Sequence, residues 1–309
     1  MFDKLAELYQ FDWRIFMAGT EAWLRGGNPY GALPGDLEAG SFAYPPTALP
    51  WLTLFVPLGV LGFYVWTALQ LGLWWRLIKD DQPQQLLLLA WAPMVLHLVE
   101  GQSSLMMVLI LWAALRAPRR GWLWGLAIAL ALTKFQVVLL PTLWLLWQDR
   151  RAPDRWRLVG GILLGTALLA LPATLRDPGI WGDWLRSLAD YQERLLYRAA
   201  WQGFSVLLLA LAGWLWYRSR RGEWHWWLTA ALFPHTSFYG IVALLPAITP
   251  TRSRWSLVGL GLAGVLQGPI NSATLPWILA GHILAAWLIA GGPSLLKAKA
   301  EAAPAAQPG

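Results

Sequence analysis

The feature that most constrains this 309-residue chain is a series of long apolar runs, separated by charged loops, that covers most of its length. Charged residues make up 13% of the chain, about half of the roughly 25% that is usual in soluble domains. Hydrophobic residues make up 57%, and there are 24 tryptophans, a residue that favours the headgroup level of a bilayer. This pattern excludes a disordered chain, a collagen-like chain and an ordinary soluble enzyme. It predicts an all-α, polytopic integral membrane protein.

The apolar runs differ in length. A hydrocarbon core of about 30 Å needs about 20 helical residues. Several runs hold fewer, as is typical of tilted helices or of broken helices that line a cavity. We expect about 11 transmembrane or half-membrane helices, with a range of 8 to 11, and no internal repeat. The runs cover residues 45–75, 85–98, 104–115, 121–133, 135–148, 157–174, 201–217, 224–233, 237–250, 255–268 and 274–291.

The loops between these runs alternate in charge. One set holds 16 of the 24 basic residues and six of the 17 acidic ones. The positive-inside rule places this set in the cytoplasm and the other set outside. We therefore attribute the net charge of +7 to orientation in a membrane and not to nucleic-acid binding. The loops predict a multi-pass membrane protein with its site on the extracytoplasmic face, and the expected location is a bacterial plasma membrane.

Three regions follow from this topology. Residues 1–43 form an outer-face segment that contains an amphipathic helix. Residues 44–291 form the transmembrane domain, which includes an outer loop at 175–200. Residues 292–309 are rich in Ala, Pro and Lys and are predicted to be a disordered cytoplasmic tail. The absence of Cys excludes disulfides, a thiolate nucleophile and Cys-ligated metal.

The outer segment begins with a predicted helix. From Trp13 to Leu24 its apolar positions fall on one helical face, and Gly26-Gly27 is suited to end it. Asp12 near its start has two interpretations. It is a helix N-cap, or it is a carboxylate at the membrane surface that acts as a general base.

Polar residues at membrane depth are costly, and they often mark a site. They occur here in Glu100-Gly101-Gln102, Lys134-Phe135-Gln136, Pro234-His235-Thr236 and at Asn271. Each also has a structural interpretation, since a lone Lys often snorkels, Gly-Gln suits a turn and His can cap a helix. All four groups fall on the same predicted side as Asp12, which favours one site that opens outward.

The outer loop 175–200 combines aromatic residues with arginines. Trp181 and Trp184 could stack on sugar rings, and Arg198 could bind a phosphate through its guanidinium fork. An amphipathic surface helix with an aromatic belt explains the same residues equally well.

A longer pattern runs through the first part of the chain. Its members are Asp12, Phe16, Ala18, Ala22, Leu24-Arg25-Gly26-Gly27-Asn28-Pro29-Tyr30, Phe42-Ala43-Tyr44-Pro45-Pro46 and Pro57-Leu58. The pattern resembles the opening of glycosyltransferase family 87, the polyprenyl-phosphate-mannose-dependent mannosyltransferases of the GT-C membrane fold. Glu100-Gly101-Gln102, Lys134-Phe135-Gln136 and Pro234-His235 resemble later positions of that family in the same order. Phe135 departs from it, because the family has Pro there.

The resemblance implies an inverting membrane hexosyltransferase, with mannose as the expected sugar. Asp12 would be the general base. Lys134, His235 and Arg198 would bind the donor phosphate, and Tyr44, Glu100, Gln102 and Gln136 would bind the sugar or the acceptor. The partners would be membrane lipid, a polyprenyl-phosphate sugar donor and a lipid- or glycan-linked acceptor, without a cofactor or a divalent metal.

Two alternatives stay open. The family has a membrane helix before its first outer loop, whereas none precedes residues 1–43 here. This predicts either that the true start codon lies further upstream, so that one helix is missing here, or that the chain is a truncated, non-catalytic relative. A lipid or solute transporter is the other alternative, because broken helices and buried polar groups are typical of transporters.

Overall fold

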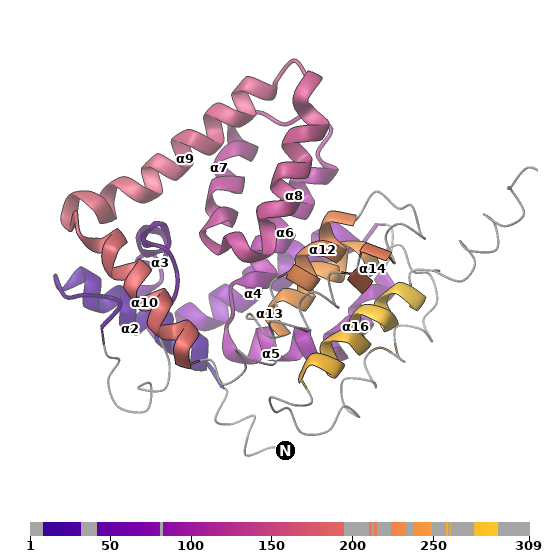
Figure 1. Cartoon of the computed structure of the whole chain (residues 1–309), viewed down its shortest axis with the longest axis horizontal. Coiled ribbons are helices and arrows are strands. Elements are labelled where there is room, and N and C mark those ends of the chain that lie inside the picture. Colours follow the sequence, from indigo (N-terminus) through magenta and orange to yellow (C-terminus); the bar gives the residue numbers. More distant parts are fainter. Residues whose placement is uncertain are drawn as a thin grey trace, which may run out of the picture.

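The computed structural model describes residues 9–31, 42–80, 83–194, 224–232, 238–248 and 275–289, together with a few single positions between them. Within these ranges the protein is helical and contains no strand, which confirms the all-α prediction (Figure 1). The longer helices are α2 (Phe11–Leu24), α4 (Val60–Ile78), α5 (Ala92–Glu100), α6 (Ser104–Arg116), α7 (Trp122–Ala131), α8 (Phe135–Gln148), α9 (Arg155–Arg176), α10 (Ile180–Arg194), α12 (Trp224–Leu232) and α16 (Leu275–Ile289).

Two helical stretches of the described residues are long and apolar enough to cross a membrane. They are Trp122–Arg151, with 30 residues, and α9, with 22. Helices α5 and α6 meet the same requirements together, but they are bent by 113° at the break between them. Two or three candidate spans indicate a membrane protein, which agrees with the prediction of an all-α membrane protein. The full set of 11 helices stays a prediction.

The stretch Trp122–Arg151 turns back on itself at the 3₁₀ turn η5 (Leu132–Lys134). Arg120 before α7 forms an ion pair with Asp149 after α8, with 2.5 Å between Nη1 and Oδ1. This contact brings the two ends of the stretch together, so α7 and α8 form a hairpin with Lys134 at its tip (Figure 1). At 1.5 Å per residue the two legs are roughly 15 and 21 Å long, shorter than a hydrocarbon core of about 30 Å.

Close backbone packing attaches this hairpin to α9. A Cβ on Gly125 of α7 would lie 2.4 Å from the carbonyl oxygen of Leu158, and one on Gly165 would lie 2.6 Å from Cβ of Ala129. Gly161 likewise faces the carbonyl of Trp122. Because 122 faces 161 and 129 faces 165, α7 and α9 run side by side in the same direction. Such small-residue contacts let membrane helices approach closely.

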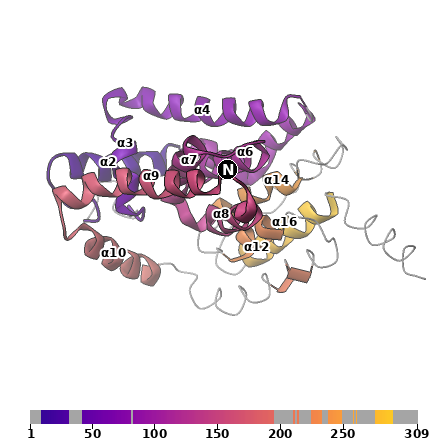
Figure 2. The ribbon, with the colours of Figure 1, turned by 90° about the horizontal axis from the view of Figure 1, so that it is seen from above.

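The first long apolar run is divided, and here the prediction of a single segment over 45–75 is wrong. The chain forms η2 (Pro46–Ala48), α3 (Leu49–Leu52), η3 (Val56–Leu58) and only then α4. Prolines interrupt the early part, and Gly59 adopts a φ of 52°, which breaks helical geometry. In Figure 2, α4 lies along one side of the molecule, with α6 and α8 between it and α12 and α16.

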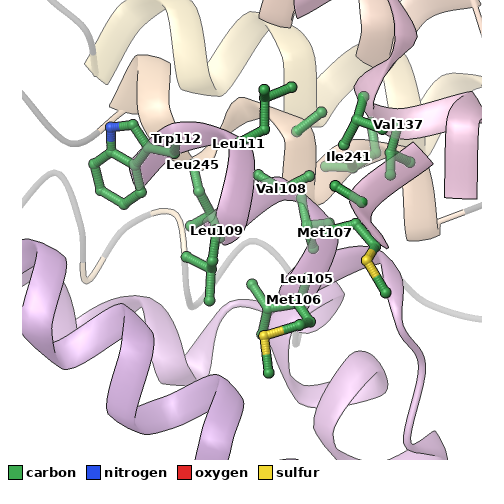
Figure 3. Close-up of a cluster of buried hydrophobic side chains, with 14 of the residues drawn as sticks. Leu105, Met106, Met107, Val108, Leu109, Leu111, Trp112, Val137, Ile241 and Leu245 are labelled. Carbon is green, nitrogen blue, oxygen red and sulfur yellow. The ribbon is translucent and has the colours of Figure 1, made fainter. Parts of the chain in front are cut away.

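Helix α6 forms the centre of the core. Its side chains from Leu105 to Leu109 are almost completely buried on all sides, which is typical of a helix surrounded by others. Figure 3 shows them beside Val137 of α8 and beside Ile241 and Leu245, which lie in α13 (Phe238–Ile241) and α14 (Leu245–Ile248). This packing fixes the position of the turn between α5 and α6.

The described charged loops gather at two ends of the bundle. At one end, Arg116 Nη1 donates to the carbonyl oxygen of Leu77 at 2.6 Å, which brings the end of α4 beside the end of α6. The Arg120–Asp149 pair adds the end of α8. At the other end, Arg176 of α9 donates to the carbonyl oxygen of Leu24. The sides of the membrane on which these loops lie stay a prediction.

Candidate functional site

The site begins where α2 meets the turn between α5 and α6. The amide of Gln10 donates to the carbonyl oxygen of Val99 at 2.8 Å, just before α2 starts. Gly101 in the turn has a φ of 77°, and a Cβ there would lie 2.7 Å from Cβ of Trp13. Only Gly combines this left-handed conformation with so close a neighbour. The turn therefore presents Gln102 to the first residues of α2.

Asp12 is not the N-cap of α2, because Gln10 occupies that position and Asp12 is the second residue of the helix. Its carboxylate Oδ2 instead accepts a hydrogen bond of 2.7 Å from Nε2 of Gln102. The two residues are 90 positions apart in the sequence. The N-cap interpretation of Asp12 is thus wrong, and the carboxylate takes part in a long-range contact.

Three donors fix the orientation of the Gln102 amide. Its Oε1 accepts from the backbone amide of Ser103 at 2.9 Å, from the hydroxyl of Tyr44 at 2.5 Å and from Nζ of Lys134 at 3.2 Å. Since these groups occupy the oxygen side, the nitrogen side has to face Asp12. The side chain of Gln102 is 2% exposed, so this orientation is also sterically enclosed.

Lys134 brings a positive charge into this buried network. It is 7% exposed, donates to the hydroxyl of Tyr44 at 2.7 Å and lies 4.2 Å from the centre of the Tyr44 ring. It also interacts electrostatically with Asp12. A buried ammonium requires such partners, because removing it from water is costly. Its place at the hairpin tip agrees with the sequence prediction that it lies at the same end as Asp12.

Tyr44 is held from several directions. Its ring packs edge-on against Phe16 of α2 with centroids 4.7 Å apart, and its hydroxyl also lies 2.5 Å from Oγ of Ser103. Its backbone carbonyl accepts from the hydroxyl of Tyr30 at 3.0 Å. Burial, followed by the nearby Asp183, raises the pKa of Tyr30 above its ordinary value, which keeps this hydroxyl protonated as a donor.

Helix α10 lies against the first outer segment. Nδ2 of Asn28 donates to a carboxylate oxygen of Asp183 at 3.0 Å, and the indole of Trp184 donates to the carbonyl oxygen of Ala43 at 3.2 Å. Trp181 donates to Thr174 at the end of α9. Helix α10 therefore contacts the segment that precedes Tyr44, at Asn28 and at Ala43.

The remaining predicted residues divide into two groups. Glu100 is buried at the end of α5, beside Gly101. Gln136 is half-buried in the first turn of α8, and within the described part of the chain its enclosed Oε1 has no hydrogen-bond partner, so it does not join the network. His235, Arg198 and Asn271 lie outside the described residues, as does the predicted tail 292–309.

Sequence reasoning missed Ser103, whose backbone and side chain both enter the network. Its position directly after Gln102 was the available signal. Across the described ranges no group of three or more His, Asp or Glu side chains is placed to hold a metal ion. The expectation that the protein needs no metal stays a prediction.

A scan of the chain against protein-family models found no matching family, and searches of curated proteins and of solved structures found no significant match. The function is therefore argued from the site alone.

Proposed function

We propose that the protein is a membrane glycosyltransferase that moves a hexose from a polyprenyl-phosphate donor to a hydroxyl acceptor on the outer face. Mannose is the expected hexose. One observation carries the proposal. A carboxylate, an amide, a phenol and an ammonium from four distant parts of the chain form one hydrogen-bonded network, through Asp12, Gln102, Tyr44 and Lys134. An acid and a cation held this close to each other suit a reaction that moves a proton and releases an anion.

In the proposed reaction, the Asp12 carboxylate takes the proton from the acceptor hydroxyl. The acceptor oxygen forms a bond with the anomeric carbon of the sugar as the bond from that carbon to the phosphate oxygen breaks. The phosphate leaves with the electron pair, so a single displacement inverts the anomeric centre. Gln102 holds one oxygen of Asp12 and thereby orients the base.

The leaving group is a phosphate and needs no strong acid. Stabilisation of its developing negative charge is sufficient, and Lys134 is the cation in position to provide it. Partial burial strengthens this interaction, because charges attract more strongly where water is excluded. His235 and Arg198 stay proposed partners of the same phosphate.

The location of the network supports a lipid-linked donor. Lys134 lies at the tip of the α7–α8 hairpin, whose legs of 10 and 14 residues are each shorter than a full span, and the α5–α6 turn meets it there. A polyprenyl chain cannot leave the hydrocarbon layer, so an enzyme that uses it has to place its catalytic groups at lipid depth.

The decisive experiment supplies membranes that contain the protein with a radiolabelled polyprenyl-phosphate hexose and measures transfer to product. We expect Asp12→Asn to lower the rate by roughly 10²–10⁴-fold, the range typical of a lost general base. The matched control is Asp177→Asn, because Asp177 lies at the same end but only accepts from the amide of Gly179 in its own turn. Full activity of Asp12→Asn at normal membrane levels would exclude the proposed role.

A transporter is the second candidate, and the 113° break between α5 and α6 favours it, since broken helices that meet at polar groups are common in transporters. The same labelled donor separates the two functions. A transporter changes the side of the vesicle on which the lipid is accessible and leaves its sugar attached. A transferase forms a new glycosidic product.

A further inference from the structure

The basic end of the bundle is built from corners that lie far apart in the sequence. Residues 116–120 and 149–157 together hold seven arginines and two aspartates. The Arg120–Asp149 ion pair joins these corners, and Arg120 also donates to the carbonyl oxygens of Ala114 and Leu115. Arg157 pairs with Asp154 at 2.9 Å. Both aspartates of this surface are thus engaged, and the excess charge is positive.

Several of the other arginines face outward. Arg119, Arg150 and Arg151 are exposed, and no ion pair to an acidic side chain is found for them within the described ranges. Because α6 and α8 end here and α9 begins here, these guanidinium groups gather at one end of the apolar helices.

Exposed tryptophans lie directly beside the arginines. Trp147 is 59% exposed with the Arg150 guanidinium 4.3 Å from its ring centre, and Trp156 is 67% exposed with that of Arg155 at 4.6 Å. Trp122 at the start of α7 is 49% exposed. Indole rings favour the headgroup level of a bilayer. The arginines that stack on them therefore lie at the level of the lipid phosphates.

From this arrangement we infer that the arginine surface formed by residues 116–120 and 149–157 binds the headgroups of anionic phospholipids. The guanidinium fork matches a phosphate in shape and charge, and the indole beside it contacts the glycerol and upper acyl region. Basic groups near a membrane end are attracted to anionic lipid, whereas a zwitterionic headgroup supplies no net charge. This site lies at the opposite end of the bundle from Asp12 and does not depend on the proposed transfer reaction.

The test uses the full chain purified in a neutral detergent. Phosphatidylglycerol is titrated against the protein, with phosphatidylcholine of the same acyl chains and inorganic phosphate as separate arms. Thermal unfolding, followed by tryptophan fluorescence, reports binding because a ligand of the folded state raises the unfolding temperature. We expect phosphatidylglycerol alone to raise it in a saturable way.

The test variant is Arg119→Gln with Arg151→Gln, which removes two exposed charges. We expect its apparent affinity for phosphatidylglycerol to fall roughly 30-fold at low salt, since each basic group near an anionic surface contributes about a 5-fold factor. The matched control, Arg25→Gln with Arg186→Gln, removes two exposed charges from the other end and should bind as the wild type does. An equal response to phosphatidylcholine or to inorganic phosphate, or unchanged affinity of the test variant, would overturn the inference.

Discussion

Positive charge occurs at both ends of the helical bundle, in contrasting surroundings. Lys134 is 7% exposed and has a hydroxyl, an amide oxygen and an aromatic ring within reach. Arg157 at the other end has a side chain that is 69% exposed. A cation in water needs no defined partner, whereas a buried one has to be positioned by its neighbours. The comparison supports the proposed reaction at the Lys134 end and the proposed lipid surface at the arginine end.

The largest difference between the ends should appear when one cation is removed from each. We expect Lys134→Met to lower sugar transfer roughly 100-fold or more, because the leaving phosphate loses its nearest cation. Its stability should fall by only about 1–3 kcal/mol, because Tyr44 and Gln102 lose a donor while the cost of burying the ammonium is removed. Arg119→Met should leave both quantities unchanged. Loss of folding in Lys134→Met would instead assign this lysine a structural role.

The next effect concerns the turn that positions the network. Gly101→Ala should destabilise the protein by about 3 kcal/mol, because Ala disfavours the left-handed conformation and its Cβ would overlap Trp13. The unfolding temperature should fall by roughly 5–10 °C. Gly72→Ala in α4 is the control, since a Cβ there meets nothing within 4 Å, and we expect it to be neutral or slightly stabilising. Similar losses in both variants would contradict the close packing of the turn.

Two buried glutamines, Gln102 and Gln70, allow a matched comparison, because the same substitution can be made at each. Gln102→Met should reduce transfer roughly 10- to 100-fold, because Asp12 loses a hydrogen bond to a charged group. Gln70 is fully buried in α4, and its amide has no hydrogen-bond partner among the described residues. Gln70→Met should therefore raise stability by about 1 kcal/mol and leave transfer unchanged. Rate and unfolding measurements on both variants would show whether Gln102 orients the base or only fills space.

The smallest expected effect concerns the ion pair that closes the α7–α8 hairpin. Its side chains are 16% and 14% exposed, so it is partly shielded from water. A double-mutant cycle with Arg120→Met and Asp149→Asn should give a coupling of about 1 kcal/mol. A coupling near zero would mean that the packing of α7 on α9 closes the hairpin without help from this pair.

The sequence predicted much of the fold wherever local chemistry decided it. Helix α2 lies where its apolar spacing placed it, and the break at Lys134 lies between the two apolar pieces that the sequence distinguished. The division of 45–75 into several elements was missed, although Pro57 and Gly59 were visible in the sequence. Apolar composition alone does not distinguish a continuous helix from a chain that winds through a core.

The site was predictable as a set of residues and not as a set of bonds. Asp12, Tyr44, Gln102 and Lys134 were each expected to lie at the same end. Their connections depend on the left-handed turn at Gly101 and on the fold-back at η5, which set distances of a few ångströms between segments up to 90 residues apart. No local pattern encodes such distances, because they result from how the helices pack.

The short legs of the α7–α8 hairpin have a consequence for the membrane itself. Lys134 rests roughly 10 Å below the outer limit of a hydrocarbon layer of about 30 Å if the arginine end marks the inner limit. Protein, and not acyl chains, covers the ammonium at that depth, because the side chain of Lys134 is 7% exposed. Helix α2, whose Phe16 packs on the Tyr44 ring, and helix α10, whose Trp184 contacts Ala43, occupy space that lipid would otherwise fill near the hairpin tip.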